Sequence, residues 1–118
     1  MGGHSLGGVA AATYVSKRED LDGLVFWASY PINDTLKNMD MKILSIYGTL
    51  DISGMDRFDS ARTYLPGDTE FVIIHGGNHA QVGDYGPQPG DNEATITRLD
   101  QQKQVVNATV KLLKEISE

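Results

Sequence analysis

Three short, mostly apolar runs divide the chain. They are LVFWA at residues 24–28, ILSIY at residues 43–47 and FVII at residues 71–74. Runs of this length, without alternation of apolar and polar residues, are typical of strands buried on both faces, as in a parallel sheet. Gly48 and Gly76 follow the second and third runs, and glycine commonly marks the end of such a strand. The pattern therefore predicts three strands of a parallel sheet.

Apolar residues at helical spacing fill the segments around these runs. The spacing predicts helices over residues 5–17, 57–65 and 95–116, the last of them long and amphipathic. Strands that alternate with helices predict an α/β fold with a small parallel sheet and flanking helices. We expect one domain, spanning residues 1–118. The apolar face of the last helix is expected to comprise Leu99, Val106, Val110 and Leu113, with Val105, Leu112 and Ile116 beside them.

A serine flanked by glycines lies near the start of the chain, in Gly3-His4-Ser5-Leu6-Gly7. This is the G-x-S-x-G pattern of a nucleophile elbow, a tight strand-to-helix turn that exposes the serine hydroxyl at the start of a helix. Gly3 and Gly7 would supply the space that such a turn needs. The alternative is a Gly-rich turn in which Ser5 caps the following helix. Dinucleotide-binding and P-loop motifs do not fit, because the glycine and lysine that they need are missing.

A serine nucleophile needs a base within hydrogen-bond reach, and the base needs an acid that orients it. His79 follows the third apolar run, in a loop where the catalytic groups of open parallel sheets collect, so we expect it to be the base. His4, inside the glycine-flanked motif, is expected to point away into packing. His75 directly follows the third run and is expected to be a strand-end residue with a structural hydrogen bond.

The expected acid is Asp51, which follows the second apolar run. The same position is also typical of an Asx-type turn, so that alternative stays open. Three other aspartates compete with it. Asp56 is expected to cap the next helix, whereas Asp34 and Asp84 lie in predicted turns. The acid and the base would thus lie at the ends of consecutive strands, in chain order after the serine.

Together, GGHSLGG, YGTLD and HGGNHAQVGDYG resemble the α/β-hydrolase superfamily, in its serine esterase and lipase-like branch. The resemblance extends over essentially the whole chain but covers only the C-terminal half of the family's fold, from the elbow to the final helix. It implies a truncated α/β-hydrolase fold with about three strands. It also implies that Ser5 is the nucleophile, Asp51 the acid and His79 the base, with the backbone N–H of Leu6 as one oxyanion donor.

The activity implied by the resemblance is that of a serine hydrolase, carboxylesterase-like, acting on a small-molecule ester or acyl substrate without a cofactor or metal. Asn78 and Tyr85 lie in the long loop at residues 77–93, where they would help to form the pocket. The alternative is that these residues belong to a plain surface loop.

The resemblance also implies deficits. In the family, several strands precede the elbow, as does a loop that supplies the second oxyanion donor, whose loss lowers the rate about 10²- to 10³-fold. The strand at 24–28 is then expected to be an unpaired edge and the elbow to be disordered. We therefore expect a homo-oligomer through this edge. The alternative is a non-catalytic fragment or fold remnant that self-associates or complements a missing N-terminal half.

Composition narrows the partners further. The net charge of −6 disfavours nucleic acid and anionic lipid, which are themselves negatively charged. No apolar run approaches the roughly 20 residues of a membrane span, and no signal peptide is visible, so the default expectation is a cytoplasmic protein. The absence of cysteine excludes disulfides and thiolate catalysis within this sequence.

Overall fold

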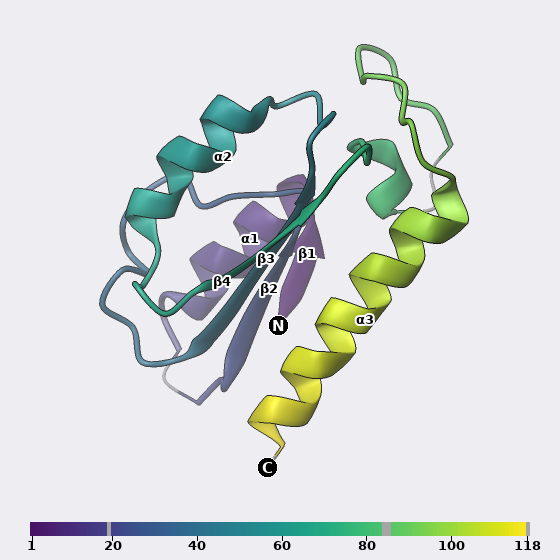
Figure 1. Cartoon of the computed structure of the whole chain (residues 1–118). Coiled ribbons are helices and arrows are strands. Elements are labelled where there is room, and N and C mark those ends of the chain that lie inside the picture. The colour runs from purple at the N-terminus through teal and green to yellow at the C-terminus, as the bar shows by residue number, and fades with distance from the viewer. Residues whose placement is uncertain (19, 84–85, 118) are drawn as a thin grey trace.

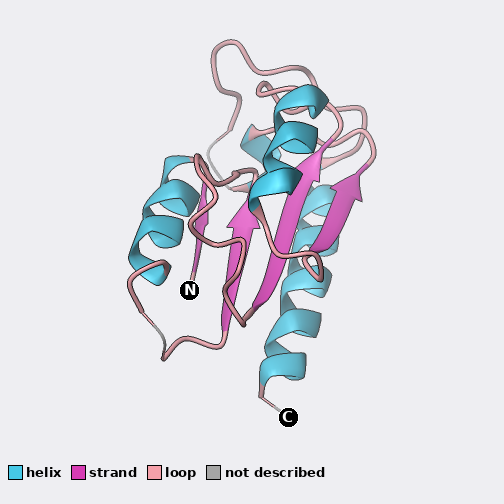
Figure 2. Ribbon diagram, turned by 90° about the vertical axis from the view of Figure 1, so that its left-hand side faces the viewer, coloured by secondary structure: helices cyan, strands magenta, loops and turns pink. Residues whose placement is uncertain are grey.

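A parallel sheet forms the centre of the molecule. The computed structural model describes residues 1–18, 20–83 and 86–117. Its strands lie in the sheet in chain order, all parallel, so their carboxyl ends meet at one edge (Figure 2). The four strands are β1 (Gly2–His4), β2 (Gly23–Trp27), β3 (Lys42–Gly48) and β4 (Glu70–Ile74).

Helices cover both faces of the sheet. Helices α1 (Leu6–Val15) and α2 (Met55–Ala61) lie on one face, and α3 (Arg98–Ile116) lies on the other (Figure 1). Short 3-10 helices, η1 (Arg62–Tyr64) and η2 (Ala80–Val82), follow α2 and β4. The expected α/β fold, with a small parallel sheet and flanking helices, is confirmed. No helix in the described ranges is long and apolar enough to span a bilayer.

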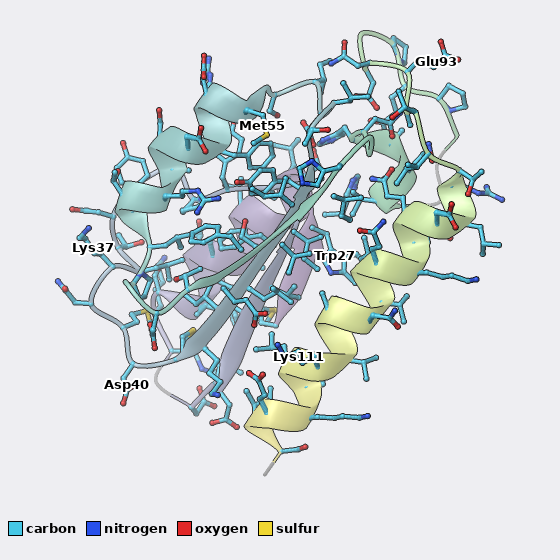
Figure 3. The ribbon with its side chains drawn as sticks, viewed as in Figure 1. Trp27, Lys37, Asp40, Met55, Glu93 and Lys111 are labelled. Atoms are coloured by element: carbon cyan, nitrogen blue, oxygen red, sulfur yellow. The ribbon has the colours of Figure 1, made fainter. Side chains whose placement is uncertain are left out.

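The strands divide their side chains between two apolar clusters, one on each face. In β2, Leu24 and Phe26 face α1, whereas Val25 and Trp27 face α3. Trp27 lies between the sheet and α3, where its indole N–H donates to Thr109 Oγ1 at 3.1 Å (Figure 3). Because both faces are covered, the central strands read as continuous apolar runs rather than as alternating ones.

The sheet has one strand more than the hydrophobic pattern predicted. β1 pairs in parallel with β2, with Gly2 opposite Val25 and His4 opposite Trp27. The expectation that the strand at 24–28 is an unpaired edge is therefore wrong, and the edge strands of the described sheet are β1 and β4. The sequence of β1, GGH, has no apolar pattern that would predict a strand. Backbone pairing with β2 makes this segment extended.

The expected apolar stripe of α3 faces solvent, not the sheet. The buried line of the helix runs through Gln101, Val105 and Leu112, with Ala108 and Ile116 packed beside it. These positions have helical spacing, but the polar Gln101 and the small Ala108 hide the line in the sequence. The four residues expected to form the apolar face, Leu99, Val106, Val110 and Leu113, are all exposed.

Helix starts also differ from the expectations, because capping decides them. α3 begins at Arg98, since the Thr97 hydroxyl accepts a hydrogen bond from Asp100 N at 3.1 Å. α2 begins after Gly54, so Asp56 lies in the first turn and is not the cap. An acidic residue there still interacts favourably with the helix dipole.

Adjacent leucines of α3 test which face is buried. Leu112→Ala should lower the free energy of unfolding by about 2–5 kcal/mol, because this side chain is 5% exposed and its removal leaves a cavity. Leu113→Ala should change it by no more than about 0.5 kcal/mol, because Leu113 is 54% exposed. Urea unfolding of both variants measures the difference. Equal losses would contradict the observed orientation of the helix.

Candidate active site

The structure brings Ser5, Asp51 and His79 together in one chain of hydrogen bonds. His79 Nδ1–H donates to Asp51 Oδ2 at 2.9 Å. Ser5 Oγ–H donates to His79 Nε2 at 3.0 Å. The three residues follow β1, β3 and β4, whose carboxyl ends meet at the same edge of the sheet. An arrangement of this kind can activate a hydroxyl, because the imidazole can accept its proton while the carboxylate holds the ring.

Ser5 occupies a strained backbone position between β1 and α1. Its φ of 56° and ψ of −123° place a non-glycine residue outside the regions that side chains normally adopt. The turn is held by Ser5 N, which donates to Trp27 O at 3.0 Å, and by Ser29 Oγ, which donates to Ser5 O at 2.6 Å. Ser5 is the N-cap residue of α1 by position, but its side chain makes no capping hydrogen bond and donates to His79 instead.

Space around the turn is limiting at Gly3 and Gly8. A Cβ on Gly3 would lie 2.3 Å from the carbonyl carbon of Gly7, as expected for the elbow. Gly7 itself has open space where a Cβ would be, so the space requirement does not extend to it. Gly8 replaces it, because a Cβ there would lie 2.5 Å from Ser29 Oγ. Sequence reasoning missed Ser29, although a polar residue directly after the first apolar run, at residues 24–28, was a usable signal.

Leu6 is the first residue of α1, and its side chain is exposed. The backbone N–H of a first helical residue has no partner within its helix. It is therefore available to a negatively charged group at the start of α1, directly after Ser5.

Asp51 combines the two interpretations left open for it. Its side chain is fully buried, and its two oxygens have separate partners. Oδ1 accepts a hydrogen bond from Ser53 N at 2.8 Å, which is an Asx-type turn. Oδ2 accepts the hydrogen bond from His79. The turn therefore fixes the carboxylate in the orientation in which it meets the imidazole.

The loops that carry Asp51 and His79 are locked against each other. Leu50 N donates to Gly77 O at 2.8 Å, and Gly76 N donates to Thr49 Oγ1 at 2.9 Å. The backbones approach so closely that a Cβ on Gly48 would lie 2.2 Å from Gly77 O. The glycine after the second apolar run therefore serves this close contact, besides ending the strand.

A fully buried glutamine from α3 supports the loop of His79. Gln101 Oε1 accepts from Asn78 N at 3.2 Å, and Gln101 Nε2 donates to Asn78 O at 2.8 Å. Both polar atoms of the glutamine thus bind the residue that precedes His79. Sequence reasoning missed Gln101, whose signal was a polar residue on the buried line of an amphipathic helix.

The predicted pocket residues have a different setting from the one expected. The amide of Asn78 is engaged within its own loop, since Oδ1 accepts from Gln81 N at 2.9 Å and Nδ2 donates to Asn92 O at 2.9 Å. Asn78 also lines a cavity of about 630 Å³ beneath the loop, but Ser5 does not line it. Tyr85 lies outside the described residues.

His4 does not point away from the site. Its Nε2–H donates to His79 O at 3.2 Å, and the centroids of the two imidazole rings lie 5.0 Å apart. The expectation of a packing role is therefore wrong, because the alternation of β1 turns His4 to the face on which His79 lies. His4 thus connects β1 to the loop that carries His79.

The pKa values of the two imidazoles are shifted in opposite directions. The hydrogen bond that His79 donates to Asp51 is the main cause that raises the pKa of His79. The charges of Asp51 and Asp91 raise it further, and burial opposes the rise. Burial is the main cause that lowers the pKa of His4. The protonated form of His79 therefore stabilises the fold below its ordinary pKa of about 6.5, and this stabilisation is lost as the pH rises through the folded value.

The competing candidates lie elsewhere. His75 is exposed in the turn after β4, and Asp34 lies in the turn region between β2 and β3. Asp84 lies outside the described residues. Within the described ranges, no group of three or more His, Asp or Glu side chains is arranged to hold a metal ion.

Comparison with known proteins gives the family of the chain. The model of the alpha/beta hydrolase family matches residues 1–103, and the chain belongs to this family. No curated protein matches the chain significantly.

Solved structures share the fold at low sequence identity. A predicted CIB-like hydrolase from Thermoplasma acidophilum has a TM-score of 0.65 and 16% identity, over 97% of this chain and 49% of its own. A candidate dienelactone hydrolase from Klebsiella pneumoniae subsp. pneumoniae has a TM-score of 0.62 and 16% identity, over 92% of this chain and 50% of its own. A dienelactone hydrolase-like promiscuous phosphotriesterase from metagenomic libraries has a TM-score of 0.61 and 15% identity, over 94% of this chain and 51% of its own. The chain spans about half the length of these structures.

Removing the carboxylate charge tests the bond between Asp51 and His79. Asp51→Asn should lower the pKa of His79, because the amide keeps the acceptor for Ser53 N but cannot stabilise the imidazolium as a charge does. NMR titration of the histidine rings measures the change. The control is Asp56→Asn, which removes a carboxylate in the first turn of α2 and should leave His79 unchanged. An unaltered His79 titration in Asp51→Asn would contradict the described geometry.

Proposed function

We propose that the protein is a serine hydrolase that transfers acyl groups to water, with carboxylesterase-like activity. The observation that carries the proposal is the continuous hydrogen-bond chain from Ser5 Oγ through His79 to Asp51, at 3.0 and 2.9 Å. Membership of the alpha/beta hydrolase family and the strained position of the serine support it.

In the proposed mechanism, His79 moves a proton between Ser5 and the leaving group. Ser5 Oγ attacks the ester carbonyl carbon while His79 Nε2 accepts the hydroxyl proton. The resulting tetrahedral intermediate collapses, the alcohol leaves with the proton from His79, and an acyl-enzyme remains. Water then attacks the acyl carbon by the same route and releases the acid. Asp51 keeps the Nδ1–H tautomer and stabilises the imidazolium.

We assign the backbone N–H of Leu6 to the oxyanion of the tetrahedral intermediate. It follows the nucleophile directly and has no partner within α1. A hydrogen bond to an oxyanion is strongest when the donor is already in place as the charge develops. The strained turn at Ser5 provides this pre-organisation.

The proposed substrate is a small ester at an open site. Dienelactone hydrolase and phosphotriesterase, the activities named for two of the solved structures, both act on ester bonds. The segment between β2 and β3 is short, and its Pro31 and Leu36 are buried, so this segment is packed down rather than raised as a lid. Ser5 is half-buried rather than fully enclosed, which suits attack on a small substrate.

A second candidate function is association through β1. The outer edge of β1 pairs with no strand in the described part of the chain, and exposed strand edges favour pairing with another chain. The partner would be a second copy of this chain or a polypeptide that completes the sheet.

A fluorophosphonate probe tests the serine hydrolase directly. The parent protein should gain one label, because the probe reacts with an activated serine, and Ser5→Ala and His79→Ala should gain none. Ser16→Ala is the matched control. Ser16 lies at the C-terminal end of α1, where its hydroxyl donates to Thr13 O, and its loss should leave labelling unchanged. Intact-mass spectrometry measures the stoichiometry.

Absence of labelling in the folded parent would sink the proposed catalytic function for this chain. Sedimentation of the same sample would then decide the second candidate. Association that rises with concentration would support it, whereas a monomer at all concentrations would oppose pairing with a second copy.

The pH dependence of labelling should follow His79. The rate should rise with pH through the pKa of His79, because only the neutral imidazole can accept the serine proton. The apparent pKa should lie above the ordinary value of about 6.5, since the hydrogen bond that His79 donates to Asp51 favours the protonated form. The second-order rate constant of labelling, measured across the neutral range, gives this value. A flat profile would show that His79 is not the base.

A further inference from the structure

We propose that Asp91 is a positioning residue for His79. It acts by holding the backbone of the base loop in the orientation that points the imidazole at its two partners. The inference rests on the proposed function, because it gives Asp91 a part in the same reaction. Asp91 does not meet the reacting atoms, so it acts through His79.

The Asp91 carboxylate binds the backbone on either side of the His79 side chain. Oδ1 accepts from His79 N at 3.3 Å, and Oδ2 accepts from Ala80 N at 2.9 Å. Two bonds from one rigid carboxylate to consecutive N–H groups fix both the position and the direction of the peptide. The Cα–Cβ bond of His79 leaves from that peptide, so its direction is fixed as well.

Asn92 extends the clamp from the base loop to the acid loop. Asn92 Nδ2 donates to Leu50 O at 2.9 Å, one residue before Asp51. Asn92 O accepts from Asn78 Nδ2 at 2.9 Å, one residue before His79. The Asp91-Asn92 pair therefore bridges the two loops whose side chains form the bond between acid and base.

The conformation of the clamp depends on its own turn. Gly90 has a φ of +85°, in the left-handed region that favours glycine, and Asp91 N donates to Gln88 O at 3.2 Å. Asn92 N donates to Asp91 Oδ1 at 3.0 Å, so the carboxylate is oriented from its own side too. A half-buried carboxylate with three backbone donors is strongly held in place.

Asp91 also acts on His79 through its charge. Among the described residues, the ionisable groups that act on the imidazole are Asp51 after β3, His4 of β1, and Asp91. The hydrogen bond that His79 donates to Asp51 is the main cause of the raised pKa of His79. The charge of the Asp91 carboxylate adds a smaller rise. Position and charge can be separated in part, because an asparagine loses the charge but keeps one acceptor oxygen, and so one of the two backbone hydrogen bonds.

The test compares Asp91→Ala, Asp91→Asn and Glu93→Ala in the full chain. Glu93 is an exposed carboxylate at the outer end of the same loop, and it serves as the charge-matched control (Figure 3). Two quantities are measured for each variant: the pKa of His79 by NMR titration, and the rate of fluorophosphonate labelling on the pH plateau. Thermal unfolding checks that each variant is folded.

Asp91→Ala should lower the pKa of His79 and lower the plateau labelling rate about 10- to 100-fold, since a misplacement on the order of 1 Å has an effect of this size. Asp91→Asn should lower the pKa similarly and lower the plateau rate less than Asp91→Ala does, because its amide oxygen can still accept one of the two backbone hydrogen bonds. Glu93→Ala should match the parent in both. A merely structural role would lower the melting temperature without this separation of charge and position.

An unchanged plateau labelling rate in a folded Asp91→Ala protein, or equal effects of Asp91→Ala and Glu93→Ala, would overturn the inference. Should the parent itself fail to label, the proposed function fails, and the NMR titration still decides whether Asp91 acts on His79. If Asp91→Ala does not fold, the decision rests on Asp91→Asn, which keeps the acceptor.

Discussion

The buried carboxylate of Asp51 is the constraint on which the site depends. A buried charge is costly unless it is hydrogen-bonded, and Asp51 has two donors, Ser53 N and His79 Nδ1. Both come from loops at the carboxyl ends of β3 and β4, which are neighbours in the sheet. Removing either loop from its place would leave the charge unsatisfied, so the fold and the acid–base pair stabilise each other.

The serine reaches this pair by a different route. It depends on β1, which is in register with β2 through backbone pairing and which sends His4 toward the carbonyl of His79. The strained turn after β1 is tolerated because Ser29 and the backbone of Trp27 hold it from β2. Ser5, His79 and Asp51 therefore follow separate strands, and each strand end contributes one polar group to a common edge.

The sequence was informative where local pattern and structure agree. Apolar runs predicted β2, β3 and β4, and the positions of Asp51 and His79 after two of these strands predicted their meeting, because parallel strand ends share one edge. β1 and the orientation of His4 could not be predicted, since pairing with β2 determines both. The inward face of α3 was also misjudged, because Gln101 serves the loop of His79 rather than the core.

The length of β1 has a consequence for motion. Native proteins open locally at free energies that depend on how many contacts each segment makes. β1 has three paired positions, on one side only, whereas β3 has five with each of its neighbours. Amide protons around Ser5 should therefore exchange with solvent through smaller openings than those of β3. Asp51 and His79 thus follow strands with more paired positions, whereas Ser5 follows the strand with the fewest.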